Sequence, residues 1–322
     1  MNVVITGGAG FIGSHLAEAL LARGDSVVAV DDLSTGRLSN VEPFADNSNF
    51  RLVVESVTNE HVLDRMVSHA DVVYHLAAAV GVKLIVDDPV RTIETNILGT
   101  ETALKVAARY RTKLFIASTS EVYGKNEQLP FNEEADMVFG STTHSRWCYA
   151  CSKAIDEFLS LAYRRRNLLP VIIARFFNTV GPRQTGQYGM VIPRFVHQAL
   201  HGEPITVYGD GEQIRCFCHV KDVVAALPVL MSEPKAEGGI FNIGSKEGTT
   251  INALAQKVKK AVGSDSPIVH IPYEQAYEAG FEDMRVRVPD TSRVSELIGF
   301  KVTRTMDDII SDVADHMRAA GE

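Results

Sequence analysis

The 322-residue sequence has no apolar run close to the roughly 18 residues that a membrane-spanning helix needs, and its N-terminus carries glycines in place of a basic leader. It also lacks an excess of positive charge, because 32 lysines and arginines stand against 40 aspartates and glutamates, a formal net charge of −8. Bulk attraction to nucleic acid or to an anionic membrane is therefore not expected. We expect a cytoplasmic protein that holds anionic ligands with local basic groups.

Cysteine is also scarce, since four residues are too few for the disulfide framework of a secreted domain. Cys148 and Cys151 form a CxxC pair, and Cys216 and Cys218 alternate in the strand-like segment RCFCHV. Neither pair has the flanking turn glycines that are typical of a zinc knuckle. We therefore expect no bound metal and interpret these cysteines as packing residues.

Short β-branched runs alternate with stretches of helical periodicity through the first half of the chain. The expected strands are residues 2–6, 26–30, 51–54, 71–77, 113–118 and 171–177, with a further helix at about residues 149–166 and, farther on, a short strand at residues 205–208. This order predicts an α/β protein with a Rossmann-type, doubly wound parallel sheet. The pattern breaks after Asn178, so we expect a dinucleotide-binding domain at residues 1–178. Residues 179–322 should then form mainly a smaller α/β substrate-binding region, interleaved with the sheet and returning strands to it.

The glycine-rich turn TGGAGFIG lies between the first expected strand and the first expected helix. Glycines there let backbone N–H groups approach a pyrophosphate at a helix N-terminus. Asp31 ends the second strand, where a carboxylate accepts a hydrogen bond from a ribose 2′-hydroxyl and repels a 2′-phosphate. The sequence therefore predicts NAD as cofactor, although Arg37 leaves NADP open. The expected contacts are Gly7, Gly10, Phe11, Ile12, Gly13, Asp31 and Asp32.

Tyr149 and Lys153 are four positions apart on an expected helix, so the lysine ammonium can lie beside the phenol. A nearby cation stabilises phenolate, which would make Tyr149 a usable base for a sugar hydroxyl. The segment STSEVYG follows the fifth strand, at the sheet edge where ligands bind in open α/β folds. It brings Thr119, Ser120 and Glu121 into the candidate site.

Together, these motifs with HLAA at residues 75–78 and NILGT at residues 96–100 resemble the extended short-chain dehydrogenase/reductases that act on nucleotide-diphosphate sugars. The resemblance covers nearly the whole chain and implies a homodimer formed through two helices of each subunit. It implies that Tyr149 acts as base, that Thr119 contacts the sugar 4-hydroxyl, and that Lys153 also holds the nicotinamide ribose. It adds Leu76, Ala77 and Asn96 as cofactor contacts and Asn178, Arg215, Arg287 and Asp290 as contacts of the substrate's nucleotide-diphosphate part.

Enzymes of this family first form a 4-keto sugar and then differ in the next step. Epimerases return hydride to the other face of C4, whereas decarboxylases and dehydratases act at C5 or C6 and carry a carboxylate at the position of Glu121. Arg146 with the following Trp147, and RCF at residues 215–217, resemble the UDP-glucuronate decarboxylases. DDLSTG at residues 31–36 and Lys83 resemble the 4-epimerases. Glu121 can also serve structure alone by hydrogen-bonding to backbone or to Arg146.

We therefore expect an NAD-dependent enzyme that acts on a UDP-hexose or a UDP-hexuronate, and we favour a UDP-sugar 4-epimerase. The alternative is a UDP-glucuronate decarboxylase, or an NDP-sugar 4,6-dehydratase, that uses Glu121. A decarboxylase must anchor the substrate carboxylate, and Arg146 and Arg215 are the candidates for that role. A third hypothesis is a non-catalytic nucleotide-sugar sensor, against which the intact Thr119, Tyr149 and Lys153 count. The nucleobase and the C5 substituent stay open.

Overall fold

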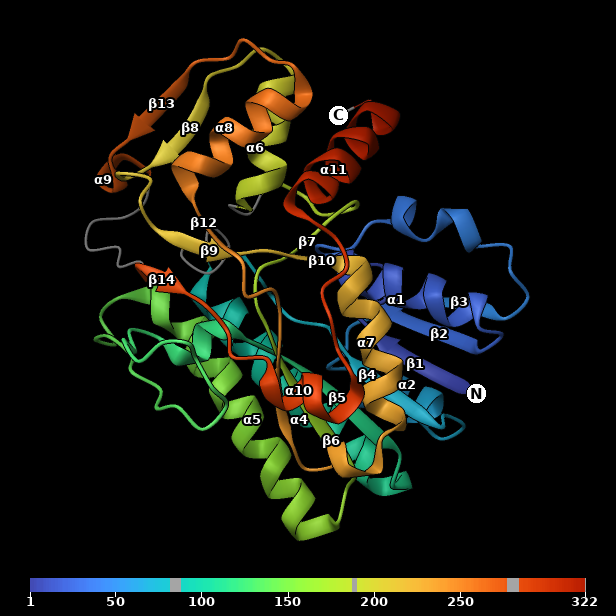
Figure 1. Cartoon of the computed structure of the whole chain (residues 1–322). Coiled ribbons are helices and arrows are strands. Elements are labelled where there is room, and N and C mark those ends of the chain that lie inside the picture. The colour runs from blue at the N-terminus through green and yellow to red at the C-terminus, as the bar shows by residue number, and fades with distance from the viewer. Residues whose placement is uncertain (82–87, 187–189, 277–283, 322) are drawn as a thin grey trace.

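A seven-stranded parallel sheet forms the core of the computed structural model (Figure 1). The structure describes residues 1–81, 88–186, 190–276 and 284–321. In spatial order the strands are β11 (Ile240–Ile243), β6 (Val171–Phe176), β5 (Lys113–Thr119), β4 (Val72–His75), β1 (Asn2–Thr6), β2 (Ser26–Asp31) and β3 (Phe50–Val54). Every neighbouring pair is parallel, so the predicted Rossmann-type sheet is confirmed.

Helices cover both faces of this sheet. The helices on one face are α1 (Phe11–Ala22) and α7 (Val220–Ser232), and those on the other are α2 (Glu60–Val67), α4 (Pro89–Tyr110) and α5 (Cys148–Asn167). Val3 and Ile5 of β1 belong to the apolar cluster on the α1 face, whereas Val4 belongs to the cluster on the α4 face. This alternation follows from the two-residue period of a strand, and it explains why these strands are apolar almost throughout.

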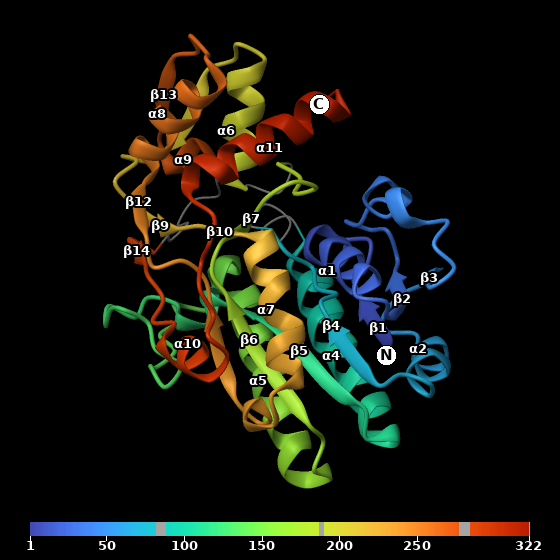
Figure 2. The same cartoon turned by 45° about the vertical axis from the view of Figure 1, so that its right-hand side comes forward.

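The smaller region packs its own apolar core between helices α6 (Val191–Leu200), α8 (Ile251–Val262) and α11 (Met306–Ala320). Its strands form small sheets, with β8 (Ile205–Tyr208) beside β13 (Ile268–Ile271), β9 (Ile214–Cys216) between β12 (Gly248–Thr250) and β14 (Val286–Arg287), and β7 (Thr179–Val180) beside β10 (Cys218–His219). The short elements are α9 (Tyr273–Ala276), α10 (Ser292–Ile298), η1 (Leu38–Asn40), η2 (Glu42–Phe44), η3 (Ser120–Tyr123), η4 (Ser145–Trp147) and η5 (Pro234–Ala236). Figure 2 shows α6, α8 and α11 stacked over one end of the sheet.

The two parts of the chain interleave beyond residue 178. Strand β11 pairs in parallel with β6, Ile240 opposite Ile173, and thereby forms one edge of the main sheet. Helix α7 also comes from this part of the sequence, and it packs against α1. As a result, the smaller region is joined to the main sheet by several crossings of the chain rather than by one linker.

Local sequence signals set the bounds of the long helices α4 and α5. The Asp88 carboxylate accepts a hydrogen bond from the Arg91 N–H, and Pro89 occupies the first turn of α4. α4 and α5 stop at Arg111 and Leu168, which adopt left-handed conformations with φ of 56° and 55°. The start of α5 at Cys148 places Tyr149 on its first turn.

Two strands, β1 and β8, have the predicted bounds, whereas β4 ends two residues before its predicted end. Leu76 and Ala77 leave the sheet at its carboxyl edge and line a cavity there.

Among the described residues, no helix combines the length and apolar character that crossing a membrane would require.

Candidate active site

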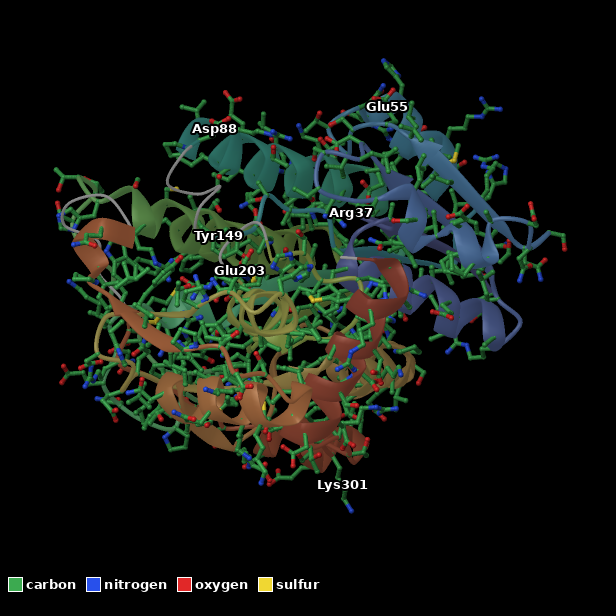
Figure 3. All side chains as sticks on the ribbon, turned by 90° about the horizontal axis from the view of Figure 1, so that it is seen from above. Arg37, Glu55, Asp88, Tyr149, Glu203 and Lys301 are labelled. Atoms are coloured by element: carbon green, nitrogen blue, oxygen red, sulfur yellow. The ribbon has the colours of Figure 1, made fainter. Side chains whose placement is uncertain are left out.

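A cavity of about 480 Å³ lies at the carboxyl edge of the main sheet, between the sheet and the smaller region. The turns after β1, β2, β4, β5 and β6 form one wall, and residues of α6, β8, β9 and β14 form the other. In the view from above, Tyr149 and Arg37, which both line the cavity, lie nearer the middle of the molecule than Asp88, Glu55 and Lys301 (Figure 3). The site is thus built by two parts of the fold, as expected for an open α/β sheet.

The glycine loop leaves no room for side chains where it bends. A Cβ atom on Gly13 would lie 2.0 Å from the Gly7 carbonyl oxygen, and one on Gly7, where φ is +71°, would lie 2.8 Å from the Ala77 nitrogen. Gly10 stands at the N-cap of α1 and provides no side-chain cap, so the first N–H groups of the helix face the loop without a side-chain acceptor. This arrangement fits the pyrophosphate of a dinucleotide. Gly7, Gly10, Phe11, Ile12 and Gly13 all line the cavity.

Asp31 connects the glycine loop to the end of β2. Its Oδ2 accepts a hydrogen bond from the Ala9 N–H at 2.9 Å, and its Oδ1 accepts one from the Leu33 N–H, also at 2.9 Å. Burial raises the pKa of Asp31, although these backbone donors oppose the shift. The carboxylate therefore braces the loop and still borders the cavity at the position expected for a ribose. Asp32 also lines the cavity and accepts a hydrogen bond from the Ser34 N–H.

Asn96 differs from its expected role, because its side chain is fully buried and lies behind the cavity wall. Its Oδ1 accepts a hydrogen bond from the Ala79 N–H at 2.8 Å, and its Nδ2 donates to Ser152 Oγ at 3.0 Å. Asn96 thus ties α4 to the loop after β4 and to α5. Asn96 would therefore act on a bound cofactor indirectly, by positioning Ala79, which lines the cavity.

Tyr149 borders the cavity on the first turn of α5, and Thr119 stands beside it at the end of β5. Burial and the Glu121 carboxylate raise the pKa of Tyr149, whereas the Thr119 hydroxyl and Arg146 lower it. In the unliganded protein the phenol is therefore protonated at neutral pH. An added positive charge beside the ring would favour the phenolate that a base requires.

Lys153 lines the same cavity, one helical turn beyond Tyr149. Its ammonium donates a hydrogen bond to Asp156 Oδ2 at 2.8 Å rather than to the phenol. The side chains of Lys153 and Asp156 are only 2% and 0% exposed. The sequence pointed to Lys153, and the i,i+3 spacing on the helix allows the pairing with Asp156, whereas the burial of the pair had no signal in the sequence.

Glu121 is held between two arginines at the cavity wall. Arg287 Nη1 lies 2.8 Å from Glu121 Oε1, and Arg146 pairs with Glu121 Oε2. Burial raises the pKa of Glu121, but Arg146 and Arg287, with Arg215 farther off, outweigh that effect and hold the pKa at about 2. The carboxylate is therefore ionised across the physiological range. Arg146 was an expected partner, whereas Arg287 was expected at the nucleotide-diphosphate part of the substrate.

The remaining predicted substrate contacts separate into two groups. Ser120, Asn178 and Arg215 line the cavity, and Asn178 Nδ2 donates to the Cys216 carbonyl oxygen at 2.8 Å. Asp290 does not line it, because its carboxylate turns into a separate shallow groove and accepts hydrogen bonds from the N–H and hydroxyl of Ser292. Lys83 lies outside the described residues.

Sequence reasoning missed the far end of the cavity, which is formed by Arg194, Tyr208, Gln213 and Tyr273. The Arg194 guanidinium stacks 3.9 Å from the centre of the Tyr208 ring. Gln213 Nε2 donates to the Tyr208 carbonyl oxygen and the Tyr273 hydroxyl, both at 3.1 Å. The buried Oε1 of Gln213 has no hydrogen-bond partner among the described residues. The one available signal was that Gln213 precedes Arg215 by two positions, so an extended chain puts both on one face.

The cysteines lie apart from this chemistry. Cys216 and Cys218 are buried, Cys148 and Cys151 are half-buried, and all four are free thiols whose pKa values are raised by burial. The part of the chain that the structure describes contains no group of three or more metal-ligating side chains.

Comparison with protein families and curated proteins identifies relatives of the whole chain. Residues 4–313 match the family described as GDP-mannose 4,6 dehydratase. UDP-N-acetyl-α-D-glucosaminuronate decarboxylase of Bacillus cytotoxicus is 43% identical over 298 residues, which cover 92% of this chain and 91% of that protein. UDP-glucuronic acid decarboxylase 4 of Arabidopsis thaliana is 38% identical, and the match covers 94% of this chain and 65% of that longer protein.

Solved structures show the same fold. UDP-glucose 4-epimerase of Thermotoga maritima, determined with UDP-glucose, matches with a TM-score of 0.89, 31% identity and full coverage of both chains. UDP-glucuronic acid 4-epimerase of Bacillus cereus, in complex with a fluorinated UDP-glucuronic acid and NAD, has a TM-score of 0.89, 27% identity, and coverage of 99% of this chain and 100% of that one. The extent of these matches and the shared Rossmann-type sheet show that the chain belongs to the GDP-mannose 4,6-dehydratase family, in the group of extended short-chain dehydrogenase/reductases that modify nucleotide sugars.

Proposed function

We propose that this protein is an NAD-dependent decarboxylase of a UDP-hexuronate, which it converts to a UDP-pentose and carbon dioxide. The observation that carries the proposal is the position of Glu121 between Arg146 and Arg287, in the wall of the cavity that Tyr149 also borders. The similarity to two UDP-hexuronate decarboxylases, at 43% and 38% identity, supports it. The epimerase that we favoured from sequence has less support than this alternative.

The charge of this cluster suits a substrate that carries a carboxylate. Arg146, Arg215 and Arg287 all line the cavity, and the ionised Glu121 offsets only one of these three positive charges. A guanidinium binds a carboxylate or a phosphate with paired hydrogen bonds. The cluster can therefore hold both a diphosphate and the carboxylate at C6 of a hexuronate. A neutral hexose would leave part of this charge unused at the reacting end of the cavity.

The side chains at the sugar end can manage the protons of decarboxylation. Bound in the glycine cradle, NAD would supply an acceptor for the hydride at C4 and later return that hydride. Tyr149 takes the proton of the 4-hydroxyl, which leaves a ketone next to the carbon that bears the carboxylate. The bond between C5 and C6 then breaks and carbon dioxide departs. The electron pair of that bond is delocalised onto the oxygen at C4 as an enolate. The protonated Tyr149 and the Thr119 hydroxyl can donate hydrogen bonds to that oxyanion.

C5 then takes up a proton, and Tyr149 returns its proton to the oxygen at C4. Overall one proton is consumed for each carbon dioxide released, and the reaction is redox-neutral. We assign the binding of the substrate carboxylate to Arg146 and Arg287. Glu121 orients these guanidinium groups through its two ion pairs, and the proton for C5 comes from solvent.

The relative at 43% identity acts on an N-acetylated hexuronate, so we place UDP-N-acetylglucosaminuronate first among the substrates to test and UDP-glucuronate second. A second candidate is 4-epimerisation of a UDP-hexuronate. The structural match to a UDP-glucuronic acid 4-epimerase favours it, as does the Thr119, Tyr149 and Lys153 set, which epimerisation also needs.

Product mass, together with chromatographic separation of C4 isomers, distinguishes these reactions. The purified protein would be incubated with NAD and, separately, UDP-N-acetylglucosaminuronate, UDP-glucuronate and UDP-glucose, with Tyr149→Phe as the control. We expect a product that lacks the mass of carbon dioxide from one or both uronates, and no such product from the control. An isobaric C4 isomer in its place would establish the second candidate. No conversion of any of the three would contradict both.

A further inference from the structure

The ion pair between Lys153 and Asp156 lies within helix α5, directly behind the cavity wall. Lys153 Nζ is 2.8 Å from Asp156 Oδ2, and the two side chains are 2% and 0% exposed. Asp156 does not line the cavity, whereas Lys153 does. A substrate or cofactor would therefore meet the lysine, and the carboxylate can act on it only through Lys153.

A buried carboxylate at this position needs an explanation beyond packing. Taking an ion pair out of water costs several kcal/mol for each charge before the attraction offsets it. The next residue, Glu157, is also buried, but it forms a fork with Arg175 and accepts a hydrogen bond from Ser118, so it braces β5 and β6. Asp156 makes no contact of that kind, since its other neighbour is the Thr100 hydroxyl of α4. Its charged hydrogen bond goes to Lys153, which lines the cavity one helical turn beyond Tyr149.

We propose that Asp156 is a positioning residue of the active site, which holds the Lys153 ammonium at the cavity wall and offsets its charge at Tyr149. The proposal rests on the proposed function, because it takes Tyr149 as the base. Without Asp156, the ammonium would be free to turn and would act on the phenol with its full charge. The carboxylate thus sets how readily Tyr149 ionises.

The charged and polar groups around Tyr149 and the Lys153–Asp156 pair come from several neighbouring elements. Glu121 of η3 raises the pKa of Tyr149, while Arg146 of η4 and the Thr119 hydroxyl lower it. His75 of β4 faces Lys153 and is neutral, because burial, aided by the Lys153 charge, lowers its pKa to about 3. From α4, the Thr100 hydroxyl hydrogen-bonds to Asp156, and the neighbouring Glu157 of α5 raises the pKa of Asp156. Arg215 and Arg287 lie beyond Glu121 and act on it.

The sign of the effect follows from these charges. Burial raises the pKa of Asp156, and Lys153 opposes this shift. The negative charge of Asp156 in turn raises the pKa of Tyr149. Removing the negative charge of Asp156 favours phenolate at Tyr149 and lowers its pKa. At low dielectric and short range, one charge shifts a neighbouring pKa by on the order of one unit.

Asp156→Asn tests this in two ways. In the pH profile of kcat/KM for decarboxylation, we expect the acid limb to move to lower pH by about one unit. Phenolate absorbance of the NAD-bound protein, measured as the difference between each protein and its own Tyr149→Phe partner, should show the same shift. This second measurement needs no turnover, so it stands even if the proposed decarboxylation fails. Asp156→Glu, which restores the charge, should return both curves toward the wild type.

Glu157→Gln is the matched control, because it removes a buried carboxylate from the next position of the same helix. It should lower thermal stability and leave both titration curves unmoved. If Asp156→Asn does not fold, the smaller Asp156→Ser replaces it in every arm. Phenolate titrations of the Asp156 variants that coincide with the wild type, or that move to higher pH, overturn the proposal. A shift of equal size in Glu157→Gln does so as well.

Discussion

Arg287 of β14 and Glu121 of η3 lie 2.8 Å apart at the cavity wall, although most of the chain's length separates them in sequence. Arg287 is also the register partner of Arg215 on β9, so the smaller region brings two guanidinium groups to the reacting end of the main sheet. Glu121, which directly follows β5 of the main sheet, forms ion pairs with Arg287 and Arg146. This relationship connects the two parts of the fold and motivates the first two predictions.

Glu121→Gln should reduce kcat for decarboxylation by on the order of 10²-fold, because it removes the ionised group that orients Arg146 and Arg287 at the substrate carboxylate. NAD affinity should not change, since Glu121 lies at the sugar end. The measurement is single-turnover release of carbon dioxide, together with a binding titration of NAD. A loss of less than about threefold would return Glu121 to a structural role.

Arg287→Gln should raise KM for the uronate substrate by on the order of tenfold or more, because the anchor of its carboxylate loses a charge-assisted hydrogen bond. Binding of UDP, which has no sugar carboxylate, should weaken much less. Calorimetric titration of both ligands into the variant provides the comparison. Equal losses for UDP and for the uronate would assign Arg287 to the diphosphate, as its sequence motif indicated.

Tyr149→Phe should reduce kcat by on the order of 10³-fold, because it removes the proton-transfer group. The fold and NAD binding should be preserved. Stopped-flow absorbance of reduced cofactor, with saturating uronate, measures the first step alone. Lys153→Met serves as the companion variant, and it should weaken NAD binding as well. Retention of more than a tenth of wild-type activity in Tyr149→Phe would be incompatible with Tyr149 as the base.

Stability should fall in mild acid because of His15, whose Nε2 lies 3.0 Å from the Pro182 carbonyl oxygen. Burial lowers the pKa of His15 from 6.5 to about 4, despite the hydrogen bond to Pro182. The unfolded chain therefore binds this proton first, and the stabilisation that is present above pH 6.5 is lost as the pH falls toward 4. The expected loss from this group is about 3 kcal/mol in the free energy of unfolding.

Urea titrations of the wild type and His15→Gln across this pH range give the measurement. The free energy of unfolding should depend less steeply on pH in His15→Gln than in the wild type. His75, which is also buried and neutral, should account for much of the remaining pH dependence. The exposed His201 provides the control, since His201→Gln should leave the slope unchanged. Parallel curves for the wild type and His15→Gln would contradict the assignment.

The dimer expected from the family resemblance remains a proposal, and the exposed apolar side chains of α4 and α5 support it. Leu98, Ile155 and Phe158 are 47%, 43% and 63% exposed on these two adjacent helices. Phe158→Asp should therefore convert a dimer to a monomer in sedimentation velocity. Val269→Asp, which alters an exposed apolar position on β13, should not. A wild-type protein that sediments as a monomer would contradict the proposed dimer.

Sequence patterns were sufficient wherever the structure depends on near neighbours in the chain. The apolar runs of β1 and β8 have the predicted bounds, and the helix that carries Tyr149 and Lys153 begins within one residue of its expected start. The glycine loop also lies where its spacing indicated, because the same few residues supply the turn, the close backbone approach and the helix start. Strand and helix periods are local properties, so one sequence reveals them.

Side-chain partners required the tertiary structure. Arg287 and Asp290 form one motif in the sequence, yet Arg287 faces the cavity and Asp290 faces another groove, because β14 ends at Arg287 and the chain then turns to pair Pro289 with Phe131. Asn96 was expected at the cofactor, and instead it supports the wall from behind.

The sequence by itself determined the Rossmann-type core, the glycine loop before α1 and the helix that carries Tyr149 and Lys153. Only the tertiary structure decided that Glu121 lies between Arg146 and Arg287 and that the Lys153–Asp156 pair of α5 is buried behind the cavity wall. The physical reason is that a charge in a low-dielectric wall is governed by whichever partners folding brings within a few ångströms. Sequence distance does not encode those partners.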